Sequence, residues 1–336
     1  MRITKEAIII QQIRNIKKYN ADELSNEAYH AHEYISGSSL VTIFFDCLAA
    51  WKFGDKSESA ALHFGIASHA ALLEPEKFAN EFQCDINKND ESVITSDAAL
   101  KAWFKVRGVP IKSTASFSDM IYQMLQTGEY PTVLKLESMI LESECKFAGK
   151  TIVKYDDYQT IMQMREVIFN DRDLQTALKD CRVEMSIICE VMIDDIWYGI
   201  KIRPDIVTGD RAVPDYKTTA DMNPEKFSNT AHNNGYWLKM ALQKDVLEAV
   251  FKKEFRPALL AQGKSKPYIP QWYWLTNEQL EVGRDQYQYA LSQYKKSSDA
   301  NVWPAYFNGF VDLPTPAYLA NRYEFEDNYM TIIEEE

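Results

Sequence analysis

The sequence predicts a mixed α/β fold in which helices flank a central sheet. Residues 182–219 alternate apolar and polar side chains between turn residues, as strands do, and the segments on both sides repeat apolar residues at helical spacing. Strands bounded by helices along the chain are typical of this class. With 46% hydrophobic and 12% aromatic residues, a chain of 336 residues can form a full core.

The first 85 residues are predicted to be helical. Residues 5–18 and 20–30 are polar segments with helical character, and the cluster at 36–39 is a favourable helix start before apolar residues at helical spacing. A further helix over 59–73 is apolar on nearly all sides and stops at Glu74-Pro75. We therefore expect this helix to lie inside the fold.

Two more regions follow. Residues 86–180 are predicted to be a largely helical insertion, broken at Pro110 and Pro131, with a short strand over 150–154. The core over 181–310 is expected to contain strands and helices in this order: strands over 183–193, 196–207 and 212–219, a long helix from Pro224 to 251, a strand over 268–276 and a helix over 277–296. Residues 1–310 would form a single domain, followed by an acidic tail over 311–336.

The composition narrows the possible function classes. The formal net charge is −12 at pH 7, whereas surfaces that grip nucleic acid are usually basic, so DNA-binding groups would have to be concentrated locally. The five cysteines form no C-x-x-C pair, which argues against a zinc ribbon or an iron–sulfur cluster and favours reduced core residues. No apolar run approaches the roughly 18 to 20 residues of a membrane span, and the N-terminus is unlike a signal peptide. We therefore expect a cytoplasmic protein with no membrane partner.

Candidate chemistry is concentrated in the segment IKIRPDIVTGDRAVPDYKTTAD, which alternates, turns near Gly209 and alternates again. Asp215 and Lys217 are two residues apart and so share one face of a strand, and the turn should place Asp205 beside them. Neighbouring carboxylates repel each other unless a cation lies between them. Such oxygen ligands suit Mg²⁺ or Mn²⁺, and a nearby lysine can stabilise charge on a phosphate. The alternative is an ordinary Asp–Lys pair on a surface hairpin, because such triplets are common.

Three separated motifs resemble the PD-(D/E)XK nuclease core of the RecE (exonuclease VIII) family. The first is RPD followed by DYKTTAD and a helix. The second, far upstream, comprises YHAHEYISGSSL, CLAAWKF and ALHFGIASHAALLEPEKF; the third is VEMSIIC, and a weaker match is NVWPAY. They keep the family's order over residues 29–306. The resemblance implies a restriction-endonuclease-like core, a mixed sheet flanked by helices, and a phage or prophage origin.

The resemblance also implies roles for the matched residues. His69, Asp205, Asp215 and the main-chain carbonyl of Tyr216 would surround the metal, and Lys217 would be the catalytic lysine. A histidine on an apolar helix needs a partner, and a metal at the sheet edge would be one. The alternative is a core histidine that is hydrogen-bonded to the backbone.

Further residues are expected at the same site. Glu184 lies where the family often has a glutamate on the first strand, and we expect it to be catalytic by binding a second metal or orienting a ligand; the alternative is a solvent-facing strand residue. The helix after the motif departs from the family's Tyr-x-x-Gln element, because Tyr236 is present, Lys239 holds the glutamine position and a glutamine follows at Gln243. These three share a helical face and, with Thr218, are expected to contact DNA. Lys239 would bind a phosphate or indicate that the activity differs from that of the family. The alternative is a lysine on a partly buried face whose stem is buried and whose ammonium group extends to solvent.

These expectations support a metal-dependent DNA exonuclease. By resemblance, it would resect one strand of linear duplex DNA from its end, 5′ to 3′, and leave a 3′ overhang for a single-strand annealing protein. A ring-shaped homo-oligomer, as in the family, would confine positive potential to a central channel and reconcile DNA binding with a net charge of −12. The alternatives are a nuclease-fold protein that binds or inhibits without cleaving, and a structure-specific or single-strand endonuclease.

Overall fold

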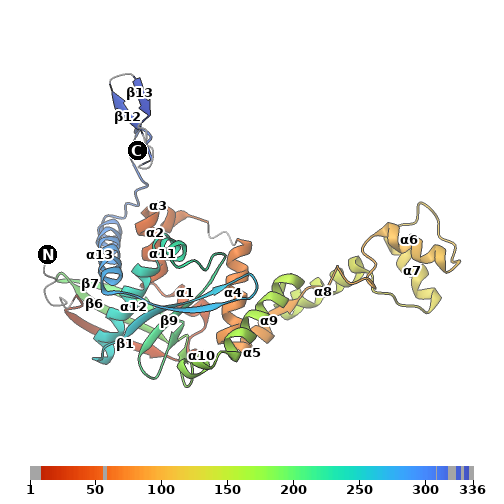
Figure 1. Ribbon diagram of the computed structural model, residues 1–336, viewed down its shortest axis with the longest axis horizontal. Coiled ribbons are helices and arrows are strands. Elements are labelled where there is room, and N and C mark those ends of the chain that lie inside the picture. Colours follow the sequence, from red (N-terminus) through yellow and green to blue (C-terminus); the bar gives the residue numbers. More distant parts are fainter. Residues whose placement is uncertain (1–8, 56–58, 308, 317–322, 327–328, 333–336) are drawn as a thin grey trace.

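A computed structural model of the chain describes residues 9–55, 59–307, 309–316, 323–326 and 329–332. Figure 1 shows a body of sheets and helices from which a helical arm projects to one side. The sheets contain both parallel and antiparallel pairs, and helices pack on them. The fold is therefore mixed α/β, as the sequence predicted.

The larger sheet has the strand order β1-β6-β7-β2. Strand β6 (Ser186–Ile193) pairs antiparallel with β7 (Ile196–Ile202) through the turn at Asp194-Asp195, and β2 (Ile35–Ser36) runs parallel to β7. Both turn residues have positive φ, a conformation that aspartate tolerates better than most residues. The predicted strands at 183–193 and 196–207 are thus largely confirmed, although Glu184 and Met185 interrupt the first.

Strand β1 (Gln12–Tyr19) corrects the helix predicted over residues 5–18, whereas the helix predicted over 20–30 is confirmed in part by α1 (Asn26–Ala31). Strand β1 pairs antiparallel with β6, with an irregularity in register between Arg14 and Lys17 and a positive φ at Asn15. The segment was predicted to be a polar helix, but pairing with the open edge of a buried strand provides backbone hydrogen bonds that an isolated polar helix would have to form alone. Residues 5–8 of the predicted helical segment lie outside the described residues.

The second sheet has the order β11-β10-β9. Strand β9 (Ala212–Thr219), which carries the DYK motif, runs parallel to β10 (Arg256–Gly263), and β10 pairs antiparallel with β11 (Pro270–Trp274). Strand β10 was not predicted, because a short apolar run without alternation does not distinguish strand from helix. It is buried along nearly all its length, which places β9 beside an interior strand.

Helices cover these sheets and form the main core with them. Helix α2 (Gly37–Phe45), α12 (Tyr236–Phe251) and α13 (Asn277–Ala300) pack on one another. The long helix predicted after Pro224 is in fact two helices, because α11 (Pro224–Asn233) ends before Gly235. Gly235 has φ +68°, and a Cβ there would lie 2.7 Å from Val41 side-chain atoms. Only glycine accommodates both the conformation and this close approach.

Helix α4 (Ala60–Leu73) packs against β9 and α9 (Tyr155–Asn170). It ends where predicted, and α5 (Pro75–Glu81) begins at the proline, a favourable first helical residue. Its burial is only partial, since Leu62 and Ile66 are 47% and 45% exposed. The expectation of a helix enclosed on nearly all sides was therefore wrong for its outer face.

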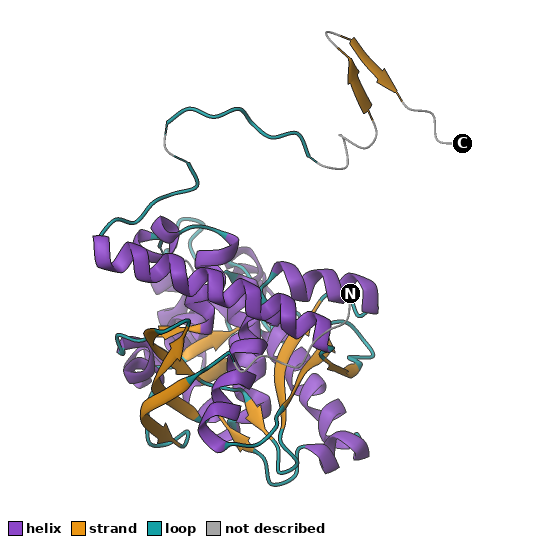
Figure 2. Cartoon of the chain, turned by 90° about the vertical axis from the view of Figure 1, so that its left-hand side faces the viewer, coloured by secondary structure: helices purple, strands orange, loops and turns teal. Residues whose placement is uncertain are grey.

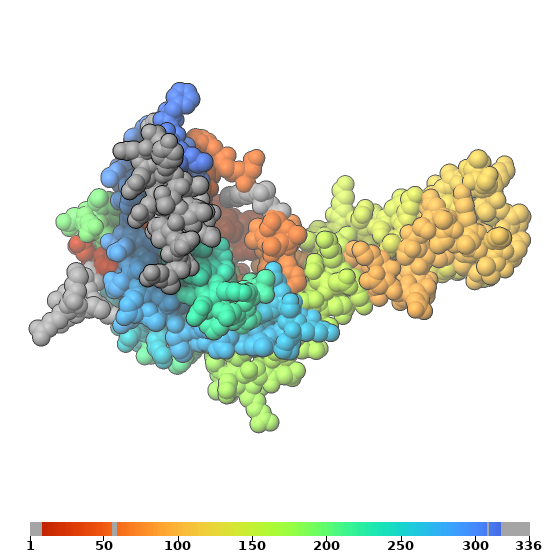
Figure 3. Space-filling model, turned by 45° about the horizontal axis from the view of Figure 1, so that its top comes forward, coloured from red at the N-terminus to blue at the C-terminus, as the bar shows by residue number. Residues whose placement is uncertain are grey.

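The arm consists of α6 (Asp97–Val106), α7 (Phe117–Thr127) and α8 (Leu134–Ala148) and stands clear of the body in Figure 3. It has a small core of its own, formed by residues from these helices and the segment before α8: Leu100, Phe104, Met120, Met124 and Val133. At its base β3 (Phe82–Cys84) pairs parallel with β4 (Thr151–Val153), close to the strand predicted at 150–154.

The remaining elements are short. Helices α1 (Asn26–Ala31), α3 (Leu48–Phe53) and α10 (Arg172–Ala177) lie around the body, and β5 (Arg182–Val183) pairs antiparallel with β8 (Ile206–Val207). In the predicted tail, β12 (Tyr323–Glu326) pairs antiparallel with β13 (Tyr329–Ile332), as Figure 2 shows. Within the described residues, no helix is both long enough and apolar enough to cross a membrane. The cysteines are free thiols, but only Cys145 and Cys189 are buried.

Candidate active site

Most of the predicted site residues line one cavity of about 560 Å³. Its walls come from α4, strand β9 and the first turns of α12, with further residues of α1, α5 and β3 and the loops that carry Glu184 and Asp205. The predicted residues that line it are His69, Glu184, Asp205, Tyr216, Lys217, Thr218, Tyr236 and Lys239. Residues separated by up to 170 positions (239 minus 69) along the chain therefore meet at one place.

The turn between β8 and β9 brings Asp205 to the DYK motif. Thr208 and Ala212 close the turn with a hydrogen bond of 3.0 Å from the Thr208 amide to the Ala212 carbonyl. The main-chain amide of Tyr216 donates to Oδ2 of Asp205 at 2.9 Å. The Lys217 ammonium forms an ion pair with Asp215 and lies 3.9 Å from Oδ2 of Asp205. Alternation along β9 thus places Asp215 and Lys217 on the same side.

Tyr216 faces the other way, as the alternation predicted. Its ring is buried among residues including Leu72, Ile168 and Leu260, and its hydroxyl donates to Oε1 of Gln262 at 2.7 Å. Burial raises the pKa of the Tyr216 hydroxyl above its ordinary value. Its main-chain carbonyl remains on the cavity side and accepts a hydrogen bond of 3.2 Å from the Lys217 ammonium.

Lys239 approaches the two aspartates from α12. Its ammonium donates to Oδ1 of Asp215 at 2.6 Å and lies 3.6 Å from Oδ1 of Asp205. Burial alone would lower the pKa of Lys239, but the charges of Asp215 and Asp205 and the hydrogen bond to Asp215 raise it above its ordinary value. Burial opposes ionisation of Asp205 as well, yet Lys239, Lys217 and His69 together hold its pKa well below the usual range. Both groups are therefore charged at neutral pH.

His69 reaches the site from α4. Its Nε2 lies 3.4 Å from Oε1 of Glu184 and 3.4 Å from Oδ2 of Asp205. Burial would lower the pKa of His69, but Asp205 and Glu184 raise it above the ordinary value. Burial raises the pKa of Glu184 to about 7, against the opposing charge of His69. These partners show that His69 does not face a purely apolar core and that Glu184 is not a solvent-facing strand residue.

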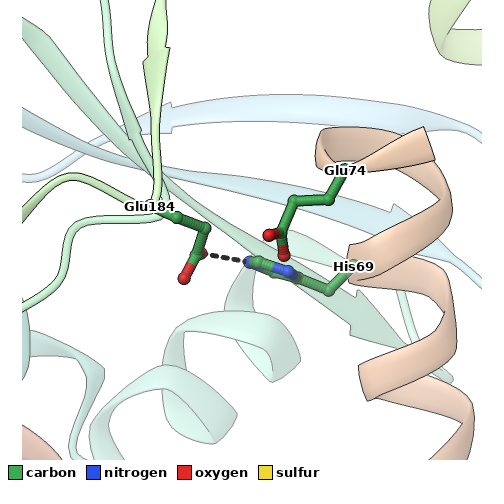
Figure 4. A group of neighbouring side chains, drawn as sticks. All are labelled: His69, Glu74 and Glu184. Atoms are coloured by element: carbon green, nitrogen blue, oxygen red, sulfur yellow. Dashed lines mark ion pairs between the residues drawn. The ribbon is translucent and has the colours of Figure 1, made fainter. Parts of the chain in front are cut away.

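Glu74 is a site residue that the sequence analysis did not single out. It ends α4, and Figure 4 shows its carboxylate turned toward the His69 ring and Glu184. One ligand atom from each of these three residues lies within 4.8 Å of the others. The Lys77 ammonium is 3.1 Å from Glu74. The signal was present in the sequence, because Glu74 lies in the quoted LLEP stretch five residues (74 minus 69) after His69.

These side chains fit a divalent metal. One imidazole nitrogen and the carboxylates of Glu74, Glu184 and Asp205 converge on the cavity, and hard divalent cations prefer oxygen-rich sites of this kind. Asp215 is 1% exposed, and its two carboxylate oxygens face the ammonium groups of Lys217 and Lys239. A buried carboxylate needs positive charge beside it, which a bound cation also provides.

The residues predicted to contact DNA are placed differently from one another. Thr218 and Tyr236 line the cavity, and the Lys217 ammonium is 5.2 Å from the Tyr236 ring centroid. Gln243 does not line it: it is 2% exposed, and its Nε2 donates to the Arg203 carbonyl at 3.5 Å in a smaller neighbouring cavity of about 160 Å³. Thr218 and Tyr236 therefore line the same cavity as Lys217, whereas Gln243 lies outside it.

The chain is similar to a protein family and to solved structures. The family described as "PDDEXK-like domain of unknown function (DUF3799)" matches residues 47–312. A solved structure of a protein named "Putative exonuclease" from Eubacterium rectale is similar with a TM-score of 0.50 and 10% identity, over 88% of this chain and 97% of that chain. A second, SSO0001, has a TM-score of 0.24 and 13% identity over 45% and 67%. No curated protein matches the chain.

The family match covers more than half of the chain and includes His69, Glu184 and the complete RPD and DYK motifs. The likeness to the Eubacterium rectale protein, at 10% identity, concerns the fold alone. Together with the site geometry, these findings place the protein in the PD-(D/E)XK nuclease superfamily. Within it, the chain belongs to the family of PDDEXK-like domains of unknown function (DUF3799).

Proposed function

We propose that this protein is a nuclease that uses a divalent metal, Mg²⁺ or Mn²⁺, to hydrolyse phosphodiester bonds in DNA. The observation that carries the proposal is the assembly of Asp205 and Lys217 at one cavity, where His69 lies beside Asp205 and Glu184, and the buried Asp215 forms an ion pair with Lys217. A structural ion pair on a surface hairpin would not require two further ionisable groups from distant elements at the same point. Clusters of strongly interacting ionisable groups in a cavity are typical of active sites.

The chain's own residues define the chemistry that the site would perform. His69, Asp205, Asp215 and the Tyr216 carbonyl, with Glu184 and Glu74 beside them, would hold the metal. When bound, it would supply charge neutralisation at the scissile phosphate and a more acidic water. The Lys217 ammonium, which lies between the Tyr216 carbonyl and the aspartates, would orient the attacking water and stabilise negative charge on the phosphate. Thr218 and Tyr236 would contact the DNA strand in the cavity.

The finer proposal is an exonuclease of the RecE type. It would resect one strand of a linear duplex from its end, 5′ to 3′, and leave a 3′ overhang for a single-strand annealing protein of a phage or prophage. Its support is the order of the motifs over residues 29–306. A ring-shaped homo-oligomer belongs to this proposal, since a net charge of −12 requires the positive potential to be confined to part of the surface.

A second candidate is a nuclease-fold protein that binds or inhibits without cleaving. One observation favours it: Lys239 and Lys217 both form ion pairs with Asp215, so its negative charge is already neutralised by the chain itself. A nuclease that cleaves single strands or DNA junctions is a third candidate with the same site chemistry.

Linear and closed-circular DNA distinguish these candidates. Linear duplex labelled at either end is incubated with the protein and Mg²⁺, beside a closed circle and a single strand, with Asp215→Asn as the control. Loss of the 5′ label first, with the circle intact, is the result expected for the RecE-type enzyme. Cleavage of the circle or of the single strand would indicate an endonuclease. Binding without cleavage at any metal concentration would favour the second candidate.

A further inference from the structure

The two aspartates of the site are held between two lysines that come from different elements. Lys239, on α12, donates to Oδ1 of Asp215 at 2.6 Å and lies 3.6 Å from Oδ1 of Asp205. Lys217, on β9, forms an ion pair with Oδ2 of Asp215 and lies 3.9 Å from Oδ2 of Asp205. Each oxygen of both carboxylates therefore faces an ammonium group. One DYK lysine is expected in such a core, whereas the second lysine stands at the position where the resemblance predicts a neutral glutamine.

The position of Lys239 is fixed by packing. The first residue of α2, Gly37, lies against its stem, so that a Cβ there would be 3.3 Å from Cγ and 3.7 Å from Cα of Lys239. The side chain is 22% exposed and lines the cavity. Its ammonium is thus directed at the aspartates while one side remains accessible to a group that enters the cavity.

The positive charge of Lys239 affects how a divalent metal binds at Asp205 and Asp215. A divalent cation that binds Asp205 and Asp215 must share their oxygens with a positive charge that already lies 2.6 Å from one of them. Two positive charges a few ångströms apart repel strongly in a partly buried site. The repulsion falls if a phosphate group accepts the ammonium instead, because the charge of Lys239 is then balanced by the ligand.

We propose that Lys239 is an internal cation that competes with the divalent metal for Asp215 and Asp205, and that a DNA phosphate entering the cavity relieves this competition. The inference rests on the proposed metal-dependent function and states when the metal binds tightly. The metal binds weakly to the protein alone and more tightly to the protein–DNA complex. Linkage makes the effect reciprocal, so the metal also tightens the binding of DNA.

Metal titration by calorimetry, without any cleavage reaction, tests the competition. Mn²⁺ is titrated into wild type, Lys239→Gln and Lys226→Gln. The last variant removes the same charge from an exposed lysine of α11 that pairs with Asp221. We expect Lys239→Gln to bind Mn²⁺ about tenfold or more tightly than wild type, and Lys226→Gln to match wild type. An equal or lower affinity in Lys239→Gln would overturn the proposal.

A short duplex with non-hydrolysable terminal linkages tests the coupling. In wild type, the duplex should raise the Mn²⁺ affinity by about fivefold or more, the lower end of usual coupling between sites, and in Lys239→Gln this gain should largely disappear. The same gain in both proteins would show that DNA acts through another group and would overturn the second half of the proposal.

Wild-type protein alone provides a further measurement if Lys239→Gln does not fold. Amine acylation followed by peptide mass spectrometry reports the accessibility of Lys239, with Lys226 as the internal reference. We expect Mn²⁺ to increase the labelling of Lys239, since the metal displaces it from Asp215; unchanged or slower labelling would contradict the competition.

Tighter Mn²⁺ binding by Lys239→Gln without cleavage by wild type would reject the proposed function alone. Cleavage by wild type with unchanged Mn²⁺ affinity in Lys239→Gln would reject this inference alone.

Discussion

The main-chain amide of Tyr216 donates a hydrogen bond of 2.9 Å to Oδ2 of Asp205. This contact ties the residue before β8 to the middle of β9, so the separation of the two acidic positions is set by the backbone. On the opposite face of β9, the Tyr216 hydroxyl donates to Gln262 of β10 at 2.7 Å and its ring is buried. One strand therefore holds the acidic site on one face and anchors it to the core on the other.

Asp215 should support both stability and cleavage. It is 1% exposed and balances two ammonium groups, so Asp215→Asn leaves Lys217 and Lys239 without their main counter-charge. We expect a loss of about 2 to 4 kcal/mol in the free energy of unfolding in chelator, less than for a fully enclosed pair because the lysines are 21% and 22% exposed. Cleavage should be abolished. Urea denaturation and a cleavage assay measure the two effects.

The control for Asp215 is Asp221→Asn, at an exposed residue of the loop after β9 that pairs with Lys226. It should change neither the unfolding free energy nor cleavage by more than a small amount. An Asp215→Asn protein that is as stable as wild type would show that the two lysines do not depend on this carboxylate. Cleavage close to the wild-type rate would remove Asp215 from the site.

His69 should matter for the metal and little for the fold. Its Nε2 faces Glu184 and Asp205 at 3.4 Å on the cavity side of α4. His69→Ala should weaken Mn²⁺ binding at least about tenfold while the melting temperature in chelator changes little. His63→Ala, an exposed position on the same helix outside the cavity, is the matched control. A large drop in melting temperature with unchanged metal affinity would make His69 a structural residue.

Glu190 should make stability depend on pH. Hydrogen bonds from Asn15, Arg14 and Tyr34 lower the pKa of Glu190 to about 2 from an ordinary value of 4.5. A carboxylate with a lower pKa in the folded state stabilises the fold above its unfolded pKa, and this contribution is lost as pH falls from about 4.5 to about 2. Glu190→Gln should therefore melt below wild type near neutral pH, and the gap should close in that acidic window.

Melting curves across this pH range, with Glu144→Gln on the exposed face of α8 as the control, test the effect of Glu190. The control should melt with wild type at every pH. A gap between Glu190→Gln and wild type that stayed constant down to about pH 2 would show that the carboxylate charge does not stabilise the pairing of β1 with β6.

The parts of the fold that sequence patterns predicted are those with strong local signals. The turn at Asp194-Asp195, the stop at Pro75 and the alternation of β9 depend on local chemistry and were found where expected. Strand β1 was missed because its conformation depends on the edge of β6, which lies more than 160 residues away (186 minus 19). Strand β10 was missed because a buried strand has no polar face to mark it.

The sequence motifs predicted only part of the site. The motif identified His69, Asp205, Asp215 and Lys217, and the structure brings all four together. Two features depended on three-dimensional placement. Glu74 joins the site because α4 ends beside Glu184. Lys239, predicted to hold a phosphate, is bound to Asp215, because the way α12 packs on the body determines how far its ammonium reaches.

Gly235 should be required for the break between α11 and α12. It has φ +68°, and an added Cβ would lie 2.7 Å from Val41 of α2. Gly235→Ala should therefore lower the free energy of unfolding by about 1 to 3 kcal/mol, through backbone strain and overpacking. Gly209→Ala, where a Cβ would meet no atom within 4 Å, is the control and should be nearly neutral. Equal stability of the two variants would mean that α2 moves to accept the methyl group.

Substitutions of Lys217 and Lys239 should affect different quantities. The first should change the cleavage rate and the second the metal affinity. Lys217 lies on the motif strand, where its ammonium contacts the Tyr216 carbonyl at 3.2 Å and faces the cavity, so it is placed to act on the attacking water and the phosphate. Lys217→Ala should reduce the cleavage rate at saturating metal by about a hundredfold or more, with duplex binding close to normal. Lys239→Gln should retain much more of that rate and change the metal concentration at which it is reached. Single-turnover kinetics over a range of Mg²⁺ concentrations measures both quantities. If Lys239→Gln abolished cleavage at every Mg²⁺ concentration while Lys217→Ala did not, the catalytic lysine of this protein would be on α12 rather than on β9.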